Sequence, residues 1–400
     1  MTRIFIAMHY LRIGGGERSL ISLLNVLPKE EFQIDLFLYR HEGELLSEVP
    51  SHVRLLPEIP EYACIEATLK SVLLSKNWRI GLARLRAKWE AHKRIKKGSK
   101  DDISILQLVA DHTTPLLPDL SSLGEYDLAI SYMTPHNIVL DKVRAKQKWG
   151  WIHTDYDTIT LDTAIELPVW SRLDHIVSIS DQVTESFLKR FPSLSDKIIR
   201  IDNFIDTDLI HKAAMATDSL DPRFKPEEEG IITLLTMARF SYPKNIDGAV
   251  RICARLIHEH GLPVKWYILG DGGDRASVEA QIKSSGMEES FILLGNKSNP
   301  YPYIAKCAVY LQPSRYEGKS IAVQEAQVLG KPVIITRYAT AQSQIEDGID
   351  GFIVPLDEEG VADGIAGLLK DPERLTSVRK ALADKQYNVA QIETFRRLVK

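Results

Sequence analysis

Two short apolar runs, with a loop and a helical segment between them, constrain the fold of this chain most. The runs are residues 308–311 and 333–335, and their arrangement is typical of the strand, loop, helix and strand of a parallel α/β unit. Glu317 lies in the loop, Glu325 lies in the helical segment, and a Gly-Lys-Ser turn stands between them. Because the first N–H groups of a helix are free and its dipole is positive there, this turn favours an anion. We interpret the stretch as a binding site for a sugar nucleotide.

The same alternation of apolar runs and helical segments occurs twice along the 400 residues, which exceeds one ordinary core. We expect an α/β domain over residues 1–206, a polar linker over 207–229 and a second α/β domain over 230–385. A C-terminal helix over 386–400 can return to the first domain. Each domain is predicted to be doubly wound, with the ligand site in the cleft between them.

The composition excludes several classes of protein. A net charge of -4 gives no general affinity for nucleic acid. The cysteines, Cys64, Cys253 and Cys307, are scattered and fit neither a metal site nor a disulfide framework. No run approaches the about 18 apolar residues of a membrane span, and the N-terminal run is too short for a signal peptide. We therefore expect a cytoplasmic protein.

Residues 65–100 interrupt the alternation with a basic amphipathic section. One helical face carries two tryptophans and two leucines, namely Trp78, Leu82, Leu85 and Trp89. Lysines and arginines crowd the rest of the section. Such a helix can lie on an anionic membrane through residues 70–100, or it can pack its apolar face on the domain and leave its charges in water. The sequence leaves both interpretations open.

Polar residues follow several predicted strands, where the carboxyl ends of a parallel sheet face a ligand. In the first half, a glycine turn that includes Gly15 and Gly16 follows the first strand, and His153 follows the strand over 148–152. The glycines let a ligand approach the backbone, or they form a tight structural turn. His153 is either a functional residue or a loop histidine bonded to backbone.

The second half offers the groups that a nucleoside diphosphate needs. Arg239 and Lys244 straddle a turn after a predicted strand, and both can converge on a diphosphate. A departing diphosphate gains negative charge, so cations there stabilise the transition state more than the ground state. Glu325 has apolar neighbours and needs a hydrogen-bonded partner, which a ribose diol would supply. Glu317 would point toward the sugar, or it would pair with Arg315.

Five motifs in a fixed order resemble those of the retaining GT-B glycosyltransferases of group 4. They are the E-x7-E pair of Glu317 and Glu325, Arg239 followed by Lys244-Asn245, the turn at 14–18, Gly270-Asp271-Gly272, and 203–206. The resemblance covers nearly the whole chain and is strongest in its second half. Lys319-Ser320 departs from the family, in which many members have an aromatic residue and a proline. The resemblance makes residues 1–206 the acceptor-side domain and 230–385 the nucleotide-sugar-binding domain.

The resemblance implies roles for individual residues. Glu325 would bind the ribose and Glu317 a sugar hydroxyl, while His153 would touch the donor sugar near the reacting carbon. The remaining donor-binding residues would be Arg239 and Lys244 at the diphosphate, with backbone of Gly318, Lys319, Ser320 and Ile321, then Gly15 and Gly16 from the first domain, and Asn296 and Lys297 at the base.

These roles imply a metal-independent, cofactor-free hexosyltransferase. It would move a hexose from a UDP- or GDP-sugar to a glycan or lipid-linked acceptor, in bacterial surface polysaccharide synthesis. A sugar-nucleotide epimerase of the same fold and a non-catalytic sugar-nucleotide-binding protein are the alternatives. A nicotinamide-dependent dehydrogenase fits less well, because the GxGxxG motif and the acidic residue for the ribose are missing.

Overall fold

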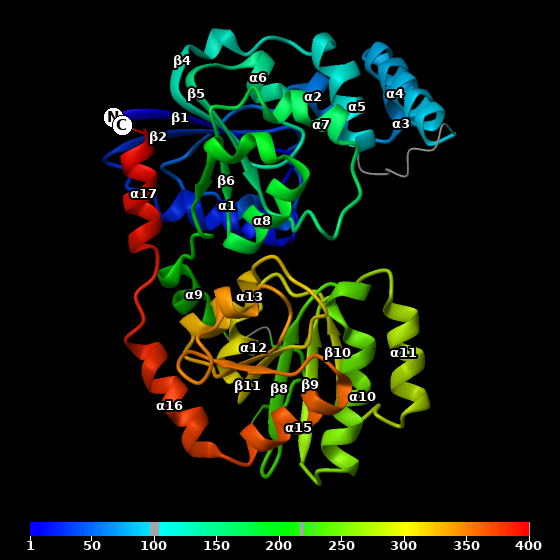
Figure 1. Ribbon diagram of the computed structural model, residues 1–400, viewed down its shortest axis with the longest axis vertical. Helices are drawn as coiled ribbons and strands as arrows, with labels where there is room; N and C mark the ends of the chain where they lie inside the picture. Colours follow the sequence, from blue (N-terminus) through cyan, green and yellow to red (C-terminus); the bar gives the residue numbers. More distant parts are fainter. Residues whose placement is uncertain (97–103, 217–219, 227, 400) are drawn as a thin grey trace. The chain divides into compact units, whose positions relative to one another are not determined.

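The computed structural model describes residues 1–96, 104–216, 220–226 and 228–399. It divides the chain into two compact units, shown in Figure 1. Unit 1 comprises Met1–Phe204 and Asn388–Lys400, and unit 2 comprises Ile205–Tyr387. Within the described ranges, we find no helix with both the length and the apolar character needed to cross a bilayer.

Unit 1 contains a parallel seven-stranded sheet in the order β3-β2-β1-β4-β5-β6-β7. Its strands are β1 (Thr2–Met8), β2 (Phe32–Leu38), β3 (Arg54–Leu55), β4 (Glu125–Ser131), β5 (Arg144–Ile152), β6 (His175–Ser178) and β7 (Ile198–Arg200). Its helices are α1 (Gly15–Val26), α2 (Pro60–Glu66), α3 (Leu69–Leu73), α4 (Trp78–Lys96), α5 (Ser104–Thr113), α6 (Asn137–Lys142), α7 (Thr163–Trp170), α8 (Asp181–Arg190) and α17 (Val389–Val399). The strand order reverses between β1 and β4, which is where doubly wound sheets open a ligand crevice.

Unit 2 repeats this plan with a parallel six-stranded sheet in the order β10-β9-β8-β11-β12-β13. Its strands are β8 (Ile232–Met237), β9 (Val264–Leu269), β10 (Phe291–Gly295), β11 (Val309–Gln312), β12 (Val333–Thr336) and β13 (Phe352–Val354). Its helices are α9 (Thr207–Ala214), α10 (Ile246–His258), α11 (Arg275–Ser284), α12 (Tyr301–Lys306), α13 (Ile321–Val328), α14 (Ala341–Gln344), α15 (Glu358–Leu369) and α16 (Pro372–Ala383). Here the order reverses between β8 and β11.

Both faces of the second sheet are buried, as the apolar runs of its strands predict. Successive side chains of a strand point to opposite faces, so Leu234 joins a core with residues of α10 and α15, whereas Leu235 joins one with residues of α12 and α13. The prediction of parallel α/β units is therefore confirmed.

The segment 207–229, expected to be a linker, is instead part of unit 2, apart from 217–219 and Glu227, which lie outside the described residues. It contains α9, and Ile210 and Phe224 are buried in the core beside Tyr267. The prediction weighed the polar composition and missed these apolar residues, whose burial outweighs it. The C-terminal helix α17 belongs to unit 1, where Arg396 pairs with Glu31 at 2.6 Å.

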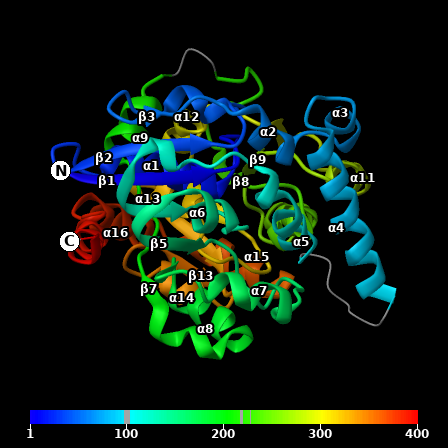
Figure 2. The same cartoon turned by 90° about the horizontal axis from the view of Figure 1, so that it is seen from above.

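The basic section contains α4, which lies alongside α5 in both Figures 1 and 2. The face that packs inward carries Ile80, Ala87 and Ala91. Trp78 and Trp89 are 51% and 59% exposed, and the two leucines of their face are exposed as well. The interpretation that this apolar face packs on the domain is therefore wrong. Lys97 and Lys100 of the basic section lie outside the described residues.

Candidate active site

Two loops meet at the switch point of unit 2, one after β8 and one after β11. Asn245 adopts the left-handed conformation with φ of 57°, which asparagine tolerates better than most residues. Its Nδ2 atom donates a hydrogen bond of 2.9 Å to the carbonyl of Pro313. The N–H of Arg315 donates to the carbonyl of Pro243 at 2.8 Å. These bonds fix the position of Lys244, the residue between Pro243 and Asn245.

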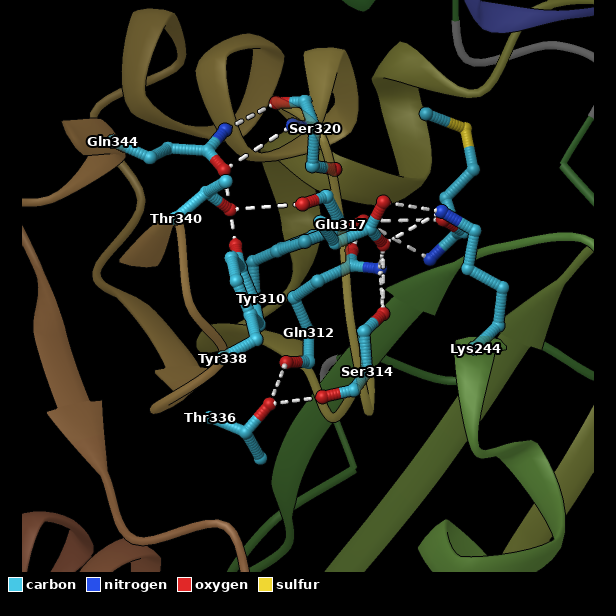
Figure 3. A network of polar contacts seen from close by, with 11 residues as sticks. Lys244, Tyr310, Gln312, Ser314, Glu317, Ser320, Thr336, Tyr338, Thr340 and Gln344 are labelled. Atoms are coloured by element: carbon cyan, nitrogen blue, oxygen red, sulfur yellow. Dashed lines mark hydrogen bonds and ion pairs between the residues drawn. The ribbon is translucent and has the colours of Figure 1, made fainter. Parts of the chain in front are cut away.

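Lys244 and Glu317, which are 73 residues apart in the sequence, form an ion pair (Figure 3). The Nζ atom of Lys244 is 2.6 Å from each carboxylate oxygen of Glu317. Glu317 Oε1 also accepts from Ser314 Oγ at 2.7 Å and from Gln312 Nε2 at 3.0 Å. A buried carboxylate needs such partners, and here they hold it in one orientation.

Polar side chains also brace the backbone of the loop after β11, as Figure 3 shows. Thr340 Oγ1 donates to the carbonyl of Glu317 at 2.9 Å. The Gln344 amide donates to the carbonyl of Ser320 and accepts from its N–H at 3.2 Å. The Ser320 N–H is thus already occupied, so an anion at this turn would use N–H groups further into α13.

The pairing of Glu317 with Arg315, considered as an alternative, is wrong. Arg315 pairs with Asp247 at 3.0 Å and lies over the ring of Tyr242 at 4.4 Å. Burial alone would raise the pKa of Asp247, but the hydrogen bond and charge of Arg315 outweigh it and lower that pKa. Arg239 is exposed, and within the described ranges it has no hydrogen-bond or ion-pair partner.

Glu325 and Lys297, which were predicted to contact the ribose and the base, have protein partners of their own. Glu325 is 2% exposed, and its Oε1 accepts from the hydroxyl of Tyr301 at 2.9 Å. The partner that a buried carboxylate needs is thus at least partly supplied by the protein. Lys297 pairs with Asp221 at 3.0 Å, while Asn296 is exposed.

The motif Gly270-Asp271-Gly272 supports the loop after β8. A Cβ atom at Gly270 would lie 2.0 Å from the carbonyl oxygen of Ala238, and one at Gly272 would lie 2.3 Å from that of Phe240. Only glycine permits this approach. The motif therefore fixes the backbone on both sides of Arg239.

Of the residues predicted in unit 1, His153 lies beside Tyr132. His153 lies with its ring centroid 4.7 Å from that of Tyr132, whose hydroxyl is 2.7 Å from Ser19 Oγ in α1. Ser19 donates to Asn203 Oδ1 at 2.9 Å, which gives the asparagine of the 203–206 motif a structural role. Gly16, in the first turn of α1, closely approaches Met133.

Burial lowers the pKa of His153 to about 4, although an interaction with the backbone of Tyr132 opposes this shift. The ring is therefore neutral near pH 7. Its Nε2 atom is buried and has no hydrogen-bond partner in the part of the chain that the structure describes. In the neutral ring, Nε2 can accept a hydrogen bond when the proton is on Nδ1.

Sequence reasoning missed the supporting residues of this site. Gln312 is a polar residue at the end of a buried strand, which is a signal that could have identified it. Thr340 and Gln344 gave no such signal. Across the described residues, no group of three or more side chains is arranged to hold a metal ion.

Comparison with solved structures identifies the fold. HepE from Anabaena, solved with UDP and glucose, superimposes with a TM-score of 0.68 at 14% identity, covering 100% of this chain and 99% of that chain. TarM from S. aureus gives a TM-score of 0.68 at 13% identity and covers 100% of both chains. The fold is thus that of the GT-B glycosyltransferases.

The sequence comparison gives a match to a family model. Residues 219–385 match the family described as "Glycosyl transferases group 1".

Curated relatives agree with this family. An N-acetylgalactosaminyltransferase of Campylobacter jejuni, whose name includes a diphospho-undecaprenol-linked sugar, is 28% identical over 219 residues. The match covers 54% of this chain and 55% of the relative. A 2-deoxystreptamine N-acetyl-D-glucosaminyltransferase of Niallia circulans is 23% identical over 77% of this chain and 76% of the relative. The chain thus spans about half the length of the first of these relatives.

Proposed function

We propose that the protein is a retaining glycosyltransferase that moves a hexose from a UDP- or GDP-sugar to a glycan or lipid-linked acceptor. The observation that carries this proposal is the Lys244–Glu317 pair at the switch point of unit 2, beside the loop that presents Arg239. The family of residues 219–385 and the UDP bound by HepE support it. The name of the Campylobacter jejuni relative supports a lipid-linked acceptor.

We place Lys244 at the diphosphate and Glu317 at the sugar of the sugar nucleotide. The ammonium group of Lys244 has three N–H groups. Two of them can bind Glu317, which leaves the third for a diphosphate oxygen. The pair is electrically neutral, so Arg239 supplies the net positive charge. The first turn of α13 adds N–H groups and the positive end of the helix dipole.

Retention follows from a single step on one face of the sugar. The bond from C1 to the diphosphate breaks while the bond from C1 to the acceptor oxygen forms, and the acceptor proton passes to the leaving diphosphate. Arg239 and Lys244 stabilise the charge that develops there, in place of a metal ion. His153 Nε2 accepts a hydrogen bond from a sugar hydroxyl, and Glu325 with Tyr301 contacts the ribose.

The test is release of nucleoside diphosphate from UDP- and GDP-hexoses, with and without an acceptor. Arg239→Met should lower release about 30- to 1,000-fold, which is the effect of losing one strong electrostatic contact in a transition state. Arg374→Met, an exposed arginine on α16, is the matched control and should leave release unchanged. Full activity in Arg239→Met would refute the phosphate assignment, and an epimer formed from donor alone would support the epimerase instead.

We further propose that the exposed face of α4 contacts an anionic membrane. An apolar stripe that contains tryptophans and is flanked by cations is the pattern of helices that lie in a membrane interface. Lys93 lies 3.6 Å above the ring of Trp89, so charge and apolar surface are side by side. The other cations of this face are Arg79 and Arg86.

Sedimentation with vesicles tests this contact. Phosphatidylglycerol vesicles should bring down the protein at low salt, and phosphatidylcholine vesicles should not. Trp78→Ser with Trp89→Ser, and separately Lys93→Glu with Arg94→Glu, should each reduce sedimentation. Lys380→Glu on α16 serves as the control. Equal sedimentation of all variants would exclude α4 as the contact.

A further inference from the structure

A cavity of about 410 Å³ lies within unit 1, at the carboxyl ends of its central strands. His9 follows β1, Met133 and Thr134 follow β4, and all three line it. The strand order reverses between β1 and β4, and doubly wound sheets bind ligands at such a point. A mainly apolar cavity with a few convergent polar groups is also the usual form of a small-molecule site.

One wall of the cavity is an apolar face of α5. Its residues are Ile105, Leu106, Val109 and Ala110. Leu106 is 55% exposed, so this wall continues to the protein surface. Exposed apolar residues that continue into a cavity fit a ligand with an apolar chain.

Another part of the cavity lining is polar. His9 Nδ1 is 2.6 Å from Glu66 Oε1, and His9 Nε2 is 3.0 Å from the carbonyl oxygen of Thr134. A carbonyl can only accept, so Nε2 carries a proton, and the contact with the carboxylate needs a second one. Burial alone would raise the pKa of Glu66, but the hydrogen bond and charge of His9, together with Arg84 and Arg12, lower it. The positive charge of His9 and the negative charge of Glu66 therefore offset each other.

Two cations of α4 line the same cavity, one helical turn apart. Arg84 Nη1 donates to the carbonyls of Cys64 and Ala67, each at 2.7 Å. Its other guanidinium N–H groups have no protein acceptor among the residues placed in the structure, and neither does Lys88. Desolvation by burial lowers the pKa of Arg84, because burial disfavours its positive charge. A bound anion would offset this desolvation cost.

The remaining carboxylate of the lining is Glu17, in the first turn of α1. Burial raises its pKa. With Glu66 paired to His9, the two cations Arg84 and Lys88 outnumber the one remaining carboxylate, so the lining favours an anion. An apolar wall beside two cations is complementary to an anionic amphiphile.

We propose that this cavity binds an anionic amphiphile, with its apolar chain against α5 and its phosphate against Arg84 and Lys88. If the proposed glycosyl transfer is right, on which this role rests, the compound is the acceptor, and the acceptor class is a lipid phosphate. The binding site itself does not depend on that reaction.

Calorimetric titration with decyl phosphate, below its micellar concentration, tests the site. Decyl phosphate should bind the full chain, while decanol and inorganic phosphate should each bind at least about tenfold more weakly. Lys88→Met should weaken binding about 5- to 15-fold, the usual effect of one charge-assisted contact. Lys29→Met, which removes an exposed cation of unit 1 outside the cavity, should not change it. Ala110→Phe should abolish binding by filling the cavity.

Equal binding by wild type, Lys88→Met and Ala110→Phe would overturn the proposal. So would equal affinity for decyl phosphate and decanol, because the cations would then play no part. UDP and GDP are titrated into the same variants as a separate measurement, since their site is in unit 2. Decyl phosphate binding without any nucleotide binding would refute the proposed transfer and leave the cavity assignment standing.

Discussion

Removing the charges of Lys244 and Glu317, singly and together, separates a structural ion pair from a donor-binding one. Lys244→Met leaves a carboxylate whose side chain is 7% exposed and which, among the described residues, has two neutral donors, Gln312 and Ser314. Breaking a fully buried pair costs about 3–5 kcal/mol, and because the Lys244 side chain is 27% exposed we expect about 1–3 kcal/mol here. Glu317→Gln should cost a similar amount, because its amide N–H would face the ammonium group.

The double variant Lys244→Met with Glu317→Gln removes both conflicts. Its loss of stability should be smaller than the sum of the single losses by about 1–2 kcal/mol. Activity should behave differently, since the double variant lacks both the phosphate and the sugar contact. We expect it to remain at least about 100-fold below wild type in nucleoside diphosphate release, although its stability recovers.

The assay for stability is urea unfolding followed by ¹⁹F NMR of protein labelled with 5-fluorotryptophan. Trp266 is the one tryptophan in the sequence of unit 2, and it is fully buried. Its resonance therefore reports on this unit apart from unit 1. Recovery of both stability and activity in the double variant would refute the reasoning, because the pair would then serve the fold alone.

Three further predictions concern individual residues. Burial raises the pKa of Glu166 from 4.5 to about 7, so the free energy of unfolding should fall by about 3 kcal/mol as pH rises through that window, and urea unfolding of Glu166→Gln should lack this slope. His153, with its pKa lowered to about 4, should show no protonation by ¹⁵N NMR between pH 5.5 and 8, and a titration in that range would contradict the neutral role. Gly272→Ala should lower the unfolding free energy by about 1–3 kcal/mol, because its Cβ would lie 2.3 Å from the Phe240 carbonyl oxygen. Gly273→Ala, with nothing within 4 Å, is its control, and equal melting of the two would contradict the close approach.

Most of the fold could be predicted because its strands are buried on both faces. A strand of this kind has a continuous apolar run, as at 231–237, where the structure has β8 at Ile232–Met237. Glycine motifs also showed where strands end. The packing of α9 and Phe224 could not be predicted, since isolated apolar residues in a polar segment do not show what they contact.

The contacts of the site were harder to predict than its residues. Periodicity placed Trp78 and Trp89 on one face of α4, but it could not show that the domain packs against Ala87 and Ala91 instead. Likewise the sequence indicated Lys244 and Glu317 separately. Their contact depends on the turn at Asn245, which joins loops that are far apart in the chain.

The central claim is that unit 2 holds a nucleoside diphosphate at the ends of β8 and β11. Calorimetric titration of the full chain with UDP, GDP and ADP tests it most directly. We predict that UDP or GDP binds and that Arg239→Met weakens this binding at least about tenfold, whereas Arg374→Met does not. Failure of all three nucleotides to bind the wild-type protein, or equal binding by the Arg239→Met variant, would contradict the account.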